Sequence, residues 1–221
     1  MPRASPSEEH PLSLAVVTEE SALERGRVLA RAGGRRILGI AGTPGAGKST
    51  LARRVVDELG STAVYVPMDG FHLANHELRR LGRADRKGAI DTFDAAGFVS
   101  LLRRLRSPDG ETAYAPLFLR EIEEPIAGWI PVAPDVPLVV TEGNYLLVDQ
   151  RSPWREIRAL LDEAWYVETD EAVRIKRLIE RHVAFGKSEA DARRWALGID
   201  ETNAELIRMT RQRADVIVQL G

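Results

Sequence analysis

The sequence predicts an α/β fold of three layers, α/β/α, with a mostly parallel central sheet, to which a family resemblance given below adds a helical lid. Two observations carry this prediction. Short apolar runs typical of buried strands alternate along the chain with longer amphipathic patterns typical of helices. Two of these runs, 37–41 and 138–140, are continuously apolar, as central parallel strands are. Functional side chains are then expected at the carboxyl ends of the strands.

The composition fits one globular domain. The chain has 221 residues, a net charge of −2, 44% hydrophobic and 29% charged residues. This charge argues against a general nucleic-acid or membrane binder, and the lack of cysteine excludes disulfides and thiolate metal sites. The first residues do not read as a signal peptide, and no apolar run is long enough to span a membrane. We therefore expect a cytoplasmic location.

Residues 1–34 are expected to form an N-terminal arm and helix, ahead of a main domain at 35–221. Residues 1–17 contain three prolines and no sustained period, so we predict a loosely ordered arm. Thr18 is a plausible cap for a helix that runs to Arg31. Its inward-facing residues would be Ala22, Val28 and Leu29.

The main domain is expected to begin with a strand at 36–41, a glycine-rich turn and a helix at 49–59. A β-branched and aromatic run, 62–70, predicts a second strand that closes on Asp69. The polar stretch that follows is irregular, with a short helix near 75–81. Asp94 then caps a helix whose apolar residues recur with helical spacing, at Phe98, Leu101, Leu102 and Leu105.

The remaining elements continue the alternation. An extended segment is expected at 112–119, and strands are expected at 137–143, 164–170 and 214–220. Helices are expected at 171–185, from a Ser188 cap onward, and from Asp200 after a break at Gly198.

One motif carries specific chemistry. Residues 42–49, Gly-Thr-Pro-Gly-Ala-Gly-Lys-Ser, match G-x-x-x-x-G-K-[ST] between a predicted strand and a predicted helix. The glycines allow backbone N–H groups to approach phosphate oxygens, Lys48 reaches the β- and γ-phosphates, and the Ser49 hydroxyl is a Mg²⁺ ligand. This predicts a P-loop NTPase fold that binds Mg-ATP. Its nucleotide-binding residues are Gly42, Thr43, Pro44, Gly45, Ala46, Gly47, Lys48, Ser49 and Thr50.

Two carboxylates follow predicted strands. Asp69 could accept the proton of an attacking hydroxyl, or it could simply form an Asp-Gly turn. It would lie beside the P-loop if the second strand neighbours the first. Glu142 ends an apolar strand, as an acid that holds Mg²⁺ with Ser49 would.

Three arginines recur on one face of the helix expected at 171–185. Arg174, Arg177 and Arg181 could close over a triphosphate and stabilise transition-state charge. They could equally form a solvated face paired with Glu171 and Glu180.

Other P-loop classes fit less well. A GTPase would need an N-K-x-D stretch to read guanine, and the sequence has none. Motor and remodelling ATPases are usually longer. A small-molecule kinase is the leading interpretation.

Several ordered motifs resemble one superfamily of P-loop kinases. "GTPGAGKST", "MDGFHLANHELRRLGRADRKGAIDTFDAAGF", "YAPLF" and "VVTEGNYLL" are together similar to the phosphoribulokinase, uridine kinase and pantothenate kinase superfamily. The similarity covers roughly residues 35–220. It is closest to a bacterial branch of nucleoside, pantothenate or fructose-transport kinases.

This resemblance implies a set of site residues. It implies Asp69 as the general base, Lys48 and Ser49 on Mg-ATP, and Glu142 near the metal. A lid at about 174–195 would bring Arg177 and Arg181 to the phosphates, and the stretch that contains Arg211 would lie near the adenine. The segment at about 70–93 would cover the acceptor. Acceptor-binding candidates are His72, Lys87, Tyr114, Arg120 and Asn144, for which surface or packing roles also remain open.

The sequence also departs from these relatives. Gly70-Phe71-His72 replaces the residues that follow the catalytic acid in uridine kinases, and the chain is shorter than type I pantothenate kinases. The acceptor therefore stays open among nucleosides, pantothenate-like molecules and sugars.

We expect an ATP- and Mg²⁺-dependent kinase that phosphorylates a hydroxyl of a small metabolite. One alternative is a nucleoside-monophosphate or dephospho-coenzyme A kinase, whose acceptor phosphate a basic cluster could bind. That cluster, which could also be a solvated face, is Arg79, Arg80, Arg83 and Arg86. Another alternative is a nucleotide-dependent regulatory switch with weak hydrolysis. The expected partner is a small molecule, with no nucleic acid or membrane, and a homodimer is left open.

Overall fold

A computed structural model describes residues 14–107 and 109–221. Its strands are β1 (Ala15–Thr18), β2 (Arg36–Gly42), β3 (Ala63–Tyr65), β4 (Ala113–Leu119), β5 (Glu124–Val132), β6 (Leu138–Glu142), β7 (Glu163–Glu168) and β8 (Val216–Gln219). Its α-helices are α1 (Glu19–Arg31), α2 (Lys48–Leu59), α3 (Asn75–Arg80), α4 (Ala95–Arg106), α5 (Glu171–Ala184), α6 (Glu189–Leu197) and α7 (Ile199–Arg208).

Six parallel strands form the central sheet in the order β1-β8-β7-β2-β6-β3. The innermost strands are largely apolar because both of their faces are covered, and every residue of β6 is buried, including Thr141 and Glu142 at its end. One face packs on α1 and α2, and the other packs on α4 with the segment 145–161. The predicted three-layer α/β/α fold is therefore confirmed.

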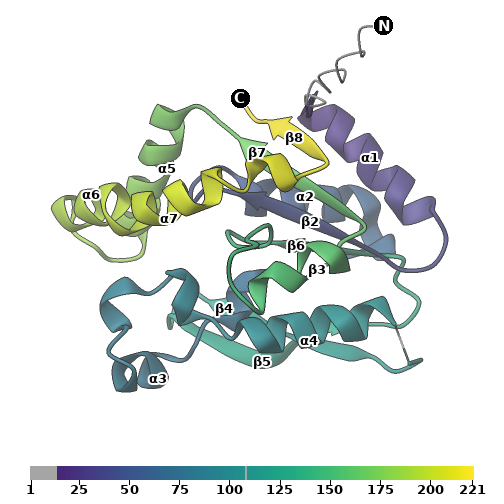
Figure 1. Cartoon of the computed structure of the whole chain (residues 1–221), viewed down its shortest axis with the longest axis horizontal. Helices are drawn as coiled ribbons and strands as arrows, with labels where there is room; N and C mark the ends of the chain where they lie inside the picture. Colours follow the sequence, from purple (N-terminus) through teal and green to yellow (C-terminus); the bar gives the residue numbers. More distant parts are fainter. Residues whose placement is uncertain (1–13, 108) are drawn as a thin grey trace, which may run out of the picture.

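A second, two-stranded sheet of β4 and β5 stands apart from the central one. Figure 1 shows α5, α6 and α7 grouped on the left of the view, with α3 and this hairpin below them. These elements surround the carboxyl ends of β2, β6 and β3, where the functional residues were expected.

Several local predictions agree with the structure. The side chain of Thr18 accepts a hydrogen bond from the backbone N–H of Ser21 and so caps α1. Asp94 caps α4 and Ser188 caps α6 in the same way. These caps are local interactions, so sequence spacing alone reveals them.

Other local predictions are wrong. Residues 15–17 were assigned to the loosely ordered arm, but they belong to β1, which pairs with β8 and extends the central sheet. The rest of that arm, 1–13, lies outside the described residues. Val28 is 60% exposed, because it lies one residue, or about 100° of helix rotation, from the inward-facing Leu29. The second strand ends at Tyr65 rather than Gly70, and β5 was not anticipated.

Within residues 14–107 and 109–221, no helix combines the length and the apolarity that a membrane-spanning helix needs.

Candidate active site

The P-loop connects β2 to α2 and has the backbone that phosphate binding requires. Gly42, Gly45 and Gly47 all have positive φ, at 152°, 82° and 99°. A Cβ on Gly45 would lie 2.8 Å from the backbone oxygen of Arg174, so glycine is also needed there for space. Gly47 caps α2 without a side-chain hydrogen bond. The first N–H groups of α2 are therefore open to an anion, at the positive end of the helix dipole.

Lys48 is the buried cation of this loop. Its side chain folds back so that Nζ donates a hydrogen bond of 3.0 Å to the carbonyl of Thr43. Burial lowers the pKa of Lys48 to about 8, although the charges of Glu142 and Asp69 partly offset this effect. The Lys48 ammonium is therefore held at the loop, where the negative charge of a bound phosphate would stabilise it more strongly than the Thr43 carbonyl does.

Glu142 ends β6 directly beside the P-loop strand, since it pairs with Ile40 of β2. The hydroxyl of Ser49 donates to its Oε1 at 3.1 Å, and the hydroxyl of Tyr65 donates to the same atom at 2.8 Å. Within the described residues no hydrogen bond reaches Oε2. Burial and the nearby Asp69 charge raise the pKa of Glu142. A hydroxyl and a carboxylate oxygen are the hard ligands that Mg²⁺ takes, so these residues fit that ion.

Asp69 reaches the site by a different route from the one the sequence indicated. The condition that β3 neighbours β2 is not met, because β6 lies between them. The chain instead turns after β3 through a 3₁₀ turn, Met68–Phe71, which brings Asp69 back toward the P-loop. This close approach needs two glycines. A Cβ on Gly143 would lie 2.6 Å from Met68, and one on Gly70 would lie 2.3 Å from the backbone oxygen of Pro116.

Replacing Gly70 by Ala is therefore expected to destabilise the protein. The clash is with backbone rather than with a flexible side chain, so either the turn or β4 must move, at a cost of about 1–3 kcal/mol. Urea unfolding of Gly70→Ala and wild type measures the change. Because the same movement displaces Asp69, turnover should fall as well. Wild-type stability and turnover in the variant would contradict the tight packing described above.

The charge of Asp69 is held in place by several cations. Its Oδ2 accepts a hydrogen bond of 3.1 Å from Nη2 of Arg120. Burial would raise the pKa of the Asp69 carboxyl, but neighbouring positive charges outweigh this and lower the pKa below its usual value. The residues that supply these charges are His72 when protonated, Arg120, Arg181 and Lys48. Asp69 is thus ionised and able to accept a hydrogen bond.

His72 lies next to Asp69 with its ring between those of Phe93 and Phe118. Its Nδ1 lies 2.8 Å from the carbonyl oxygen of Asp69. A carbonyl only accepts, so Nδ1 carries the hydrogen, and Nε2 of the neutral ring is left as an acceptor. Burial lowers the pKa of His72, and this shift favours the neutral ring despite the nearby charge of Asp69.

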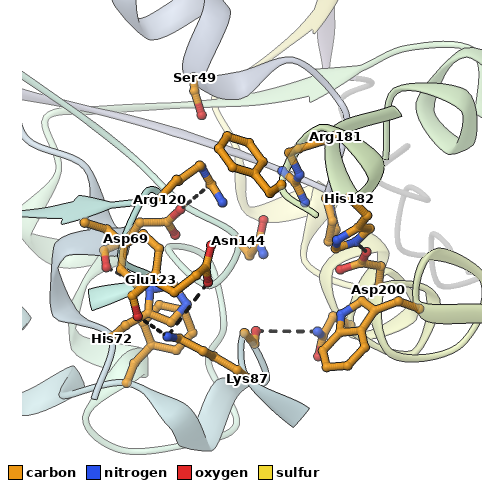
Figure 2. Close-up of a pocket in the computed structure, with 18 of the residues that line it drawn as sticks. Ser49, Asp69, His72, Lys87, Arg120, Glu123, Asn144, Arg181, His182 and Asp200 are labelled. Atoms are coloured by element: carbon orange, nitrogen blue, oxygen red, sulfur yellow. Dashed lines mark hydrogen bonds and ion pairs between the residues drawn. The ribbon is translucent and has the colours of Figure 1, made fainter. Parts of the chain in front are cut away.

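Two cavities, of about 360 Å³ and about 380 Å³, meet at these residues. The smaller one extends toward α3 and α7, and the larger one toward Arg53, Tyr65 and Arg177. Figure 2 shows the smaller cavity, with the Arg120–Asp69 pair facing Arg181 and His182 across it. Seven residues line both cavities: Lys48, Ser49, Asp69, Phe118, Arg120, Glu142 and Arg181. The shared wall is where the two cavities could bring two reactants together.

The three arginines of α5 do not act alike. Arg177 lines the larger cavity and Arg181 lines both. Arg174 is only 1% exposed, and it donates a 3.1 Å hydrogen bond to the carbonyl of Pro44 while it pairs with Glu171 and Glu201. It therefore ties α5 and α7 to the outer side of the P-loop and does not face either cavity.

The proposed acceptor residues divide in a similar way. His72, Lys87, Arg120 and Asn144 line the smaller cavity. Lys87 is already engaged, since its Nζ donates to the side chain of Asn75 at 2.6 Å and to the carbonyl of Glu123. It thus ties the tip of the β4–β5 hairpin to α3. Tyr114 is 60% exposed and lines neither cavity.

Arg211 and the basic cluster also lie outside both cavities. Arg211 pairs with Glu168 at the end of β7. Three members of the cluster have local acidic partners: Arg80 pairs with Glu77, and both Arg83 and Arg86 pair with Asp91. The cluster is therefore a locally paired surface, which removes the main support for a phosphorylated acceptor bound through it.

Sequence reasoning missed several residues of the site. Tyr65 lies at the end of β3, where its position before Asp69 was a usable signal. His182 and Asp200 form a 2.7 Å pair between α5 and α7 on the wall of the smaller cavity, and Lys187 and Trp195 line the same wall. No sequence signal identifies these four, because their location depends on how α5, α6 and α7 pack.

Comparison with known proteins identifies the family. A model of the Phosphoribulokinase / Uridine kinase family matches residues 37–221. The chain belongs to this family. The resemblance drawn from its motifs is confirmed, and the chain is a small-molecule kinase.

Individual relatives align with most of this chain. A Schizosaccharomyces pombe protein provisionally named uridine kinase is 33% identical over 196 residues, 84% of this chain and 83% of that protein. Uridine kinase from Halobacterium salinarum is 30% identical over 188 residues, 83% of this chain and 80% of that protein. The solved structure of a Silicibacter sp. TM1040 protein, provisionally named a fructose transport system kinase, is similar with a TM-score of 0.81. It is 35% identical and covers 93% of this chain and 100% of that chain.

Proposed function

We propose that this kinase transfers the γ-phosphoryl group of Mg-ATP to a hydroxyl of a small metabolite, with Asp69 as the general base. The observation that carries the proposal is the wall shared by the two cavities. An ionised carboxylate, the P-loop lysine and a serine–glutamate pair suited to Mg²⁺ all line it. An acceptor hydroxyl in one cavity and a triphosphate on the P-loop would meet there.

The roles follow from the geometry. The open amides of the P-loop and Lys48 would bind the phosphates, and Arg177 and Arg181 would neutralise charge on the transferring group. Ser49 and Glu142 would hold Mg²⁺, which when bound withdraws charge from the phosphate oxygens. Tyr65 would orient the Glu142 carboxylate through its hydrogen bond. Asp69 would orient the acceptor hydroxyl and take its proton.

The low pKa of Asp69 is compatible with this role. Phosphoryl transfer passes through a loose transition state in which positioning and electrostatics matter more than the strength of the base. A carboxylate that stays ionised is always ready to accept the hydrogen bond of the hydroxyl. The ion pair with Arg120 fixes its orientation.

ATP binding is expected to weaken as the pH rises above about 8. A triphosphate beside Lys48 stabilises the charged ammonium, so binding raises its pKa from about 8 in the free chain. The affinity for ATP should not change with pH below about pH 7. Above about pH 8 it should decrease by up to about tenfold per pH unit, because binding must then take up a proton. Calorimetric titration of a non-hydrolysable ATP analogue across this range measures it. Lys48→Met should bind weakly at every pH, whereas a pH-independent affinity in wild type would contradict the assignment.

The proposal is tested by an ADP-release screen with Mg-ATP. Nucleosides, pantothenate, sugars and small hydroxy acids are each compared with a reaction that lacks an acceptor. The expected result is one class of acceptor that raises turnover far above background in wild type and not in Asp69→Asn. Slow hydrolysis that no acceptor accelerates and that Asp69→Asn leaves unchanged would overturn it.

A further inference from the structure

The smaller cavity carries positive charge that its own acidic residues do not neutralise. Glu123 is the acid nearest Lys87, and Asp200 pairs with His182. Lys48 and Arg181 lie by the P-loop, where the triphosphate would neutralise them. Two further cations lie on the walls of this cavity: Arg120, one donor of which pairs with Asp69, and Lys187.

Lys187 lies in the link between α5 and α6. Its Nζ is 4.2 Å from the centre of the Trp195 ring, and in the described part of the chain no carboxylate lies within ion-pair distance of it. A cation–π contact orients an ammonium but does not neutralise it. Lys187 can therefore bind an anion in the cavity without giving up an existing ion pair.

Two aromatic rings and one carboxylate contact the guanidinium of Arg120. Its central carbon lies 5.8 Å from the ring centre of Phe118 on β4 and 5.8 Å from that of Phe185 at the end of α5. One Nη2 hydrogen bond goes to Asp69, yet a guanidinium has five N–H donors. The other donors can therefore make the paired hydrogen bonds that arginine forms with a carboxylate or a phosphate.

We propose that the acceptor is an anion: a small hydroxyl metabolite whose carboxylate or phosphate group is bound by Arg120 and Lys187. The inference rests on the kinase activity proposed above and adds the chemical class of its acceptor. Arg120 then contacts the acceptor anion with some of its donors and the base Asp69 with another. This arrangement places the reacting hydroxyl close to the anionic group and next to Oδ2 of Asp69.

The same charges disfavour a neutral acceptor. A nucleoside or an uncharged sugar would displace water from Arg120 and Lys187 without supplying a counter-charge, so the lost hydration of these cations would not be compensated. A charged acceptor avoids this penalty and gains charge-assisted hydrogen bonds. The cavity therefore selects for negative charge.

The test compares acceptors that differ in charge and little else. The pairs are glycerate and glycerol, pantothenate and pantothenyl alcohol, and a hexose 6-phosphate and the same hexose. Binding is measured by calorimetry in saturating magnesium and a non-hydrolysable ATP analogue, so that the P-loop is filled. The first two pairs test for a carboxylate and the third for a phosphate.

In at least one pair the charged member is expected to bind about tenfold or more tightly than the neutral one. Arg120→Gln should remove most of that difference, Lys187→Gln should reduce it, and Arg120→Lys should restore part of it. Lys176→Gln is the matched control, because Lys176 is an exposed α5 cation that lines neither cavity. The affinity of each variant for the analogue is measured first, so that saturation holds.

Three results would overturn the inference: neutral members that bind as tightly as their charged partners in every pair, charge-selective binding that Arg120→Gln leaves intact, or no binding by any charged member. Turnover with a neutral acceptor that Asp69→Asn abolishes would leave the kinase proposal standing while this inference fails. Tight, Arg120-dependent anion binding without phosphoryl transfer would instead count against the kinase proposal alone.

Discussion

Replacing Asp69 by Asn is expected to lower turnover by about 10²–10⁴-fold. Asn keeps the shape of the side chain but cannot take the proton of the acceptor hydroxyl. The P-loop and Lys48 are unchanged, so the affinity for Mg-ATP should change little. Steady-state kinetics with the acceptor found in the screen, together with a titration of the ATP analogue, separate the two effects.

Asp57→Asn is the control for this variant, because Asp57 is an exposed carboxylate on α2. It should have wild-type turnover. A large loss of nucleotide affinity in Asp69→Asn would instead show that Asp69 contributes mainly to the nucleotide or metal site. Unchanged turnover would remove Asp69 from the mechanism.

Replacing Lys48 by Ala is expected to lower kcat/KM for ATP by about 10²–10³-fold. Lys48 is the one buried lysine of the shared wall, and its loss removes the full positive charge that the P-loop itself places beside the phosphates. The effect should appear in turnover as well as in affinity, because charge on the transferring group is stabilised in the transition state. Kinetics at varied ATP concentration give both.

Lys176→Ala is the matched control, since it removes an exposed lysine of α5 that lines neither cavity. Circular dichroism and thermal unfolding establish that Lys48→Ala is folded. A folded variant with wild-type kcat/KM would contradict the assignment of this loop as the phosphate site.

The P-loop could be predicted from sequence because its function is local. Eight consecutive residues determine the positive φ angles, the helix N-terminus and the positions of Lys48 and Ser49. Glu142 could also be predicted from the sequence, since an acid at the end of a buried parallel strand must lie at the same edge of the sheet as the P-loop.

Asp69 was predicted correctly to lie at this edge of the sheet, but the strand order on which that prediction depended was wrong. Sequence order suggested that β3 neighbours β2, whereas β6 is inserted between them. Strand order depends on which crossovers pack best, and this is a property of the whole sheet. The 3₁₀ turn and the close packing at Gly70 and Gly143 compensate for the extra strand.

Periodicity identified the arginine face of α5 but could not tell which arginine faces the site. Arg174 is buried because Glu201 of α7 and the carbonyl of Pro44 surround it, and neither contact is visible in the sequence of α5. Tyr114 on β4 and Arg120, the first residue after this strand, are six residues apart, which is about 20 Å of extended chain. Only one of them can therefore reach Asp69, and the sequence does not show which.

The most direct measurement follows the γ-phosphate itself. Wild type and Asp69→Asn are incubated with γ-labelled ATP, magnesium and the accelerating acceptor, and the label is divided between phosphorylated acceptor and inorganic phosphate. The account predicts that wild type places the label on a hydroxyl of the acceptor and that Asp69→Asn does so only at a small fraction of that rate. Label found only in inorganic phosphate, at a rate that neither the acceptor nor the substitution changes, would contradict it.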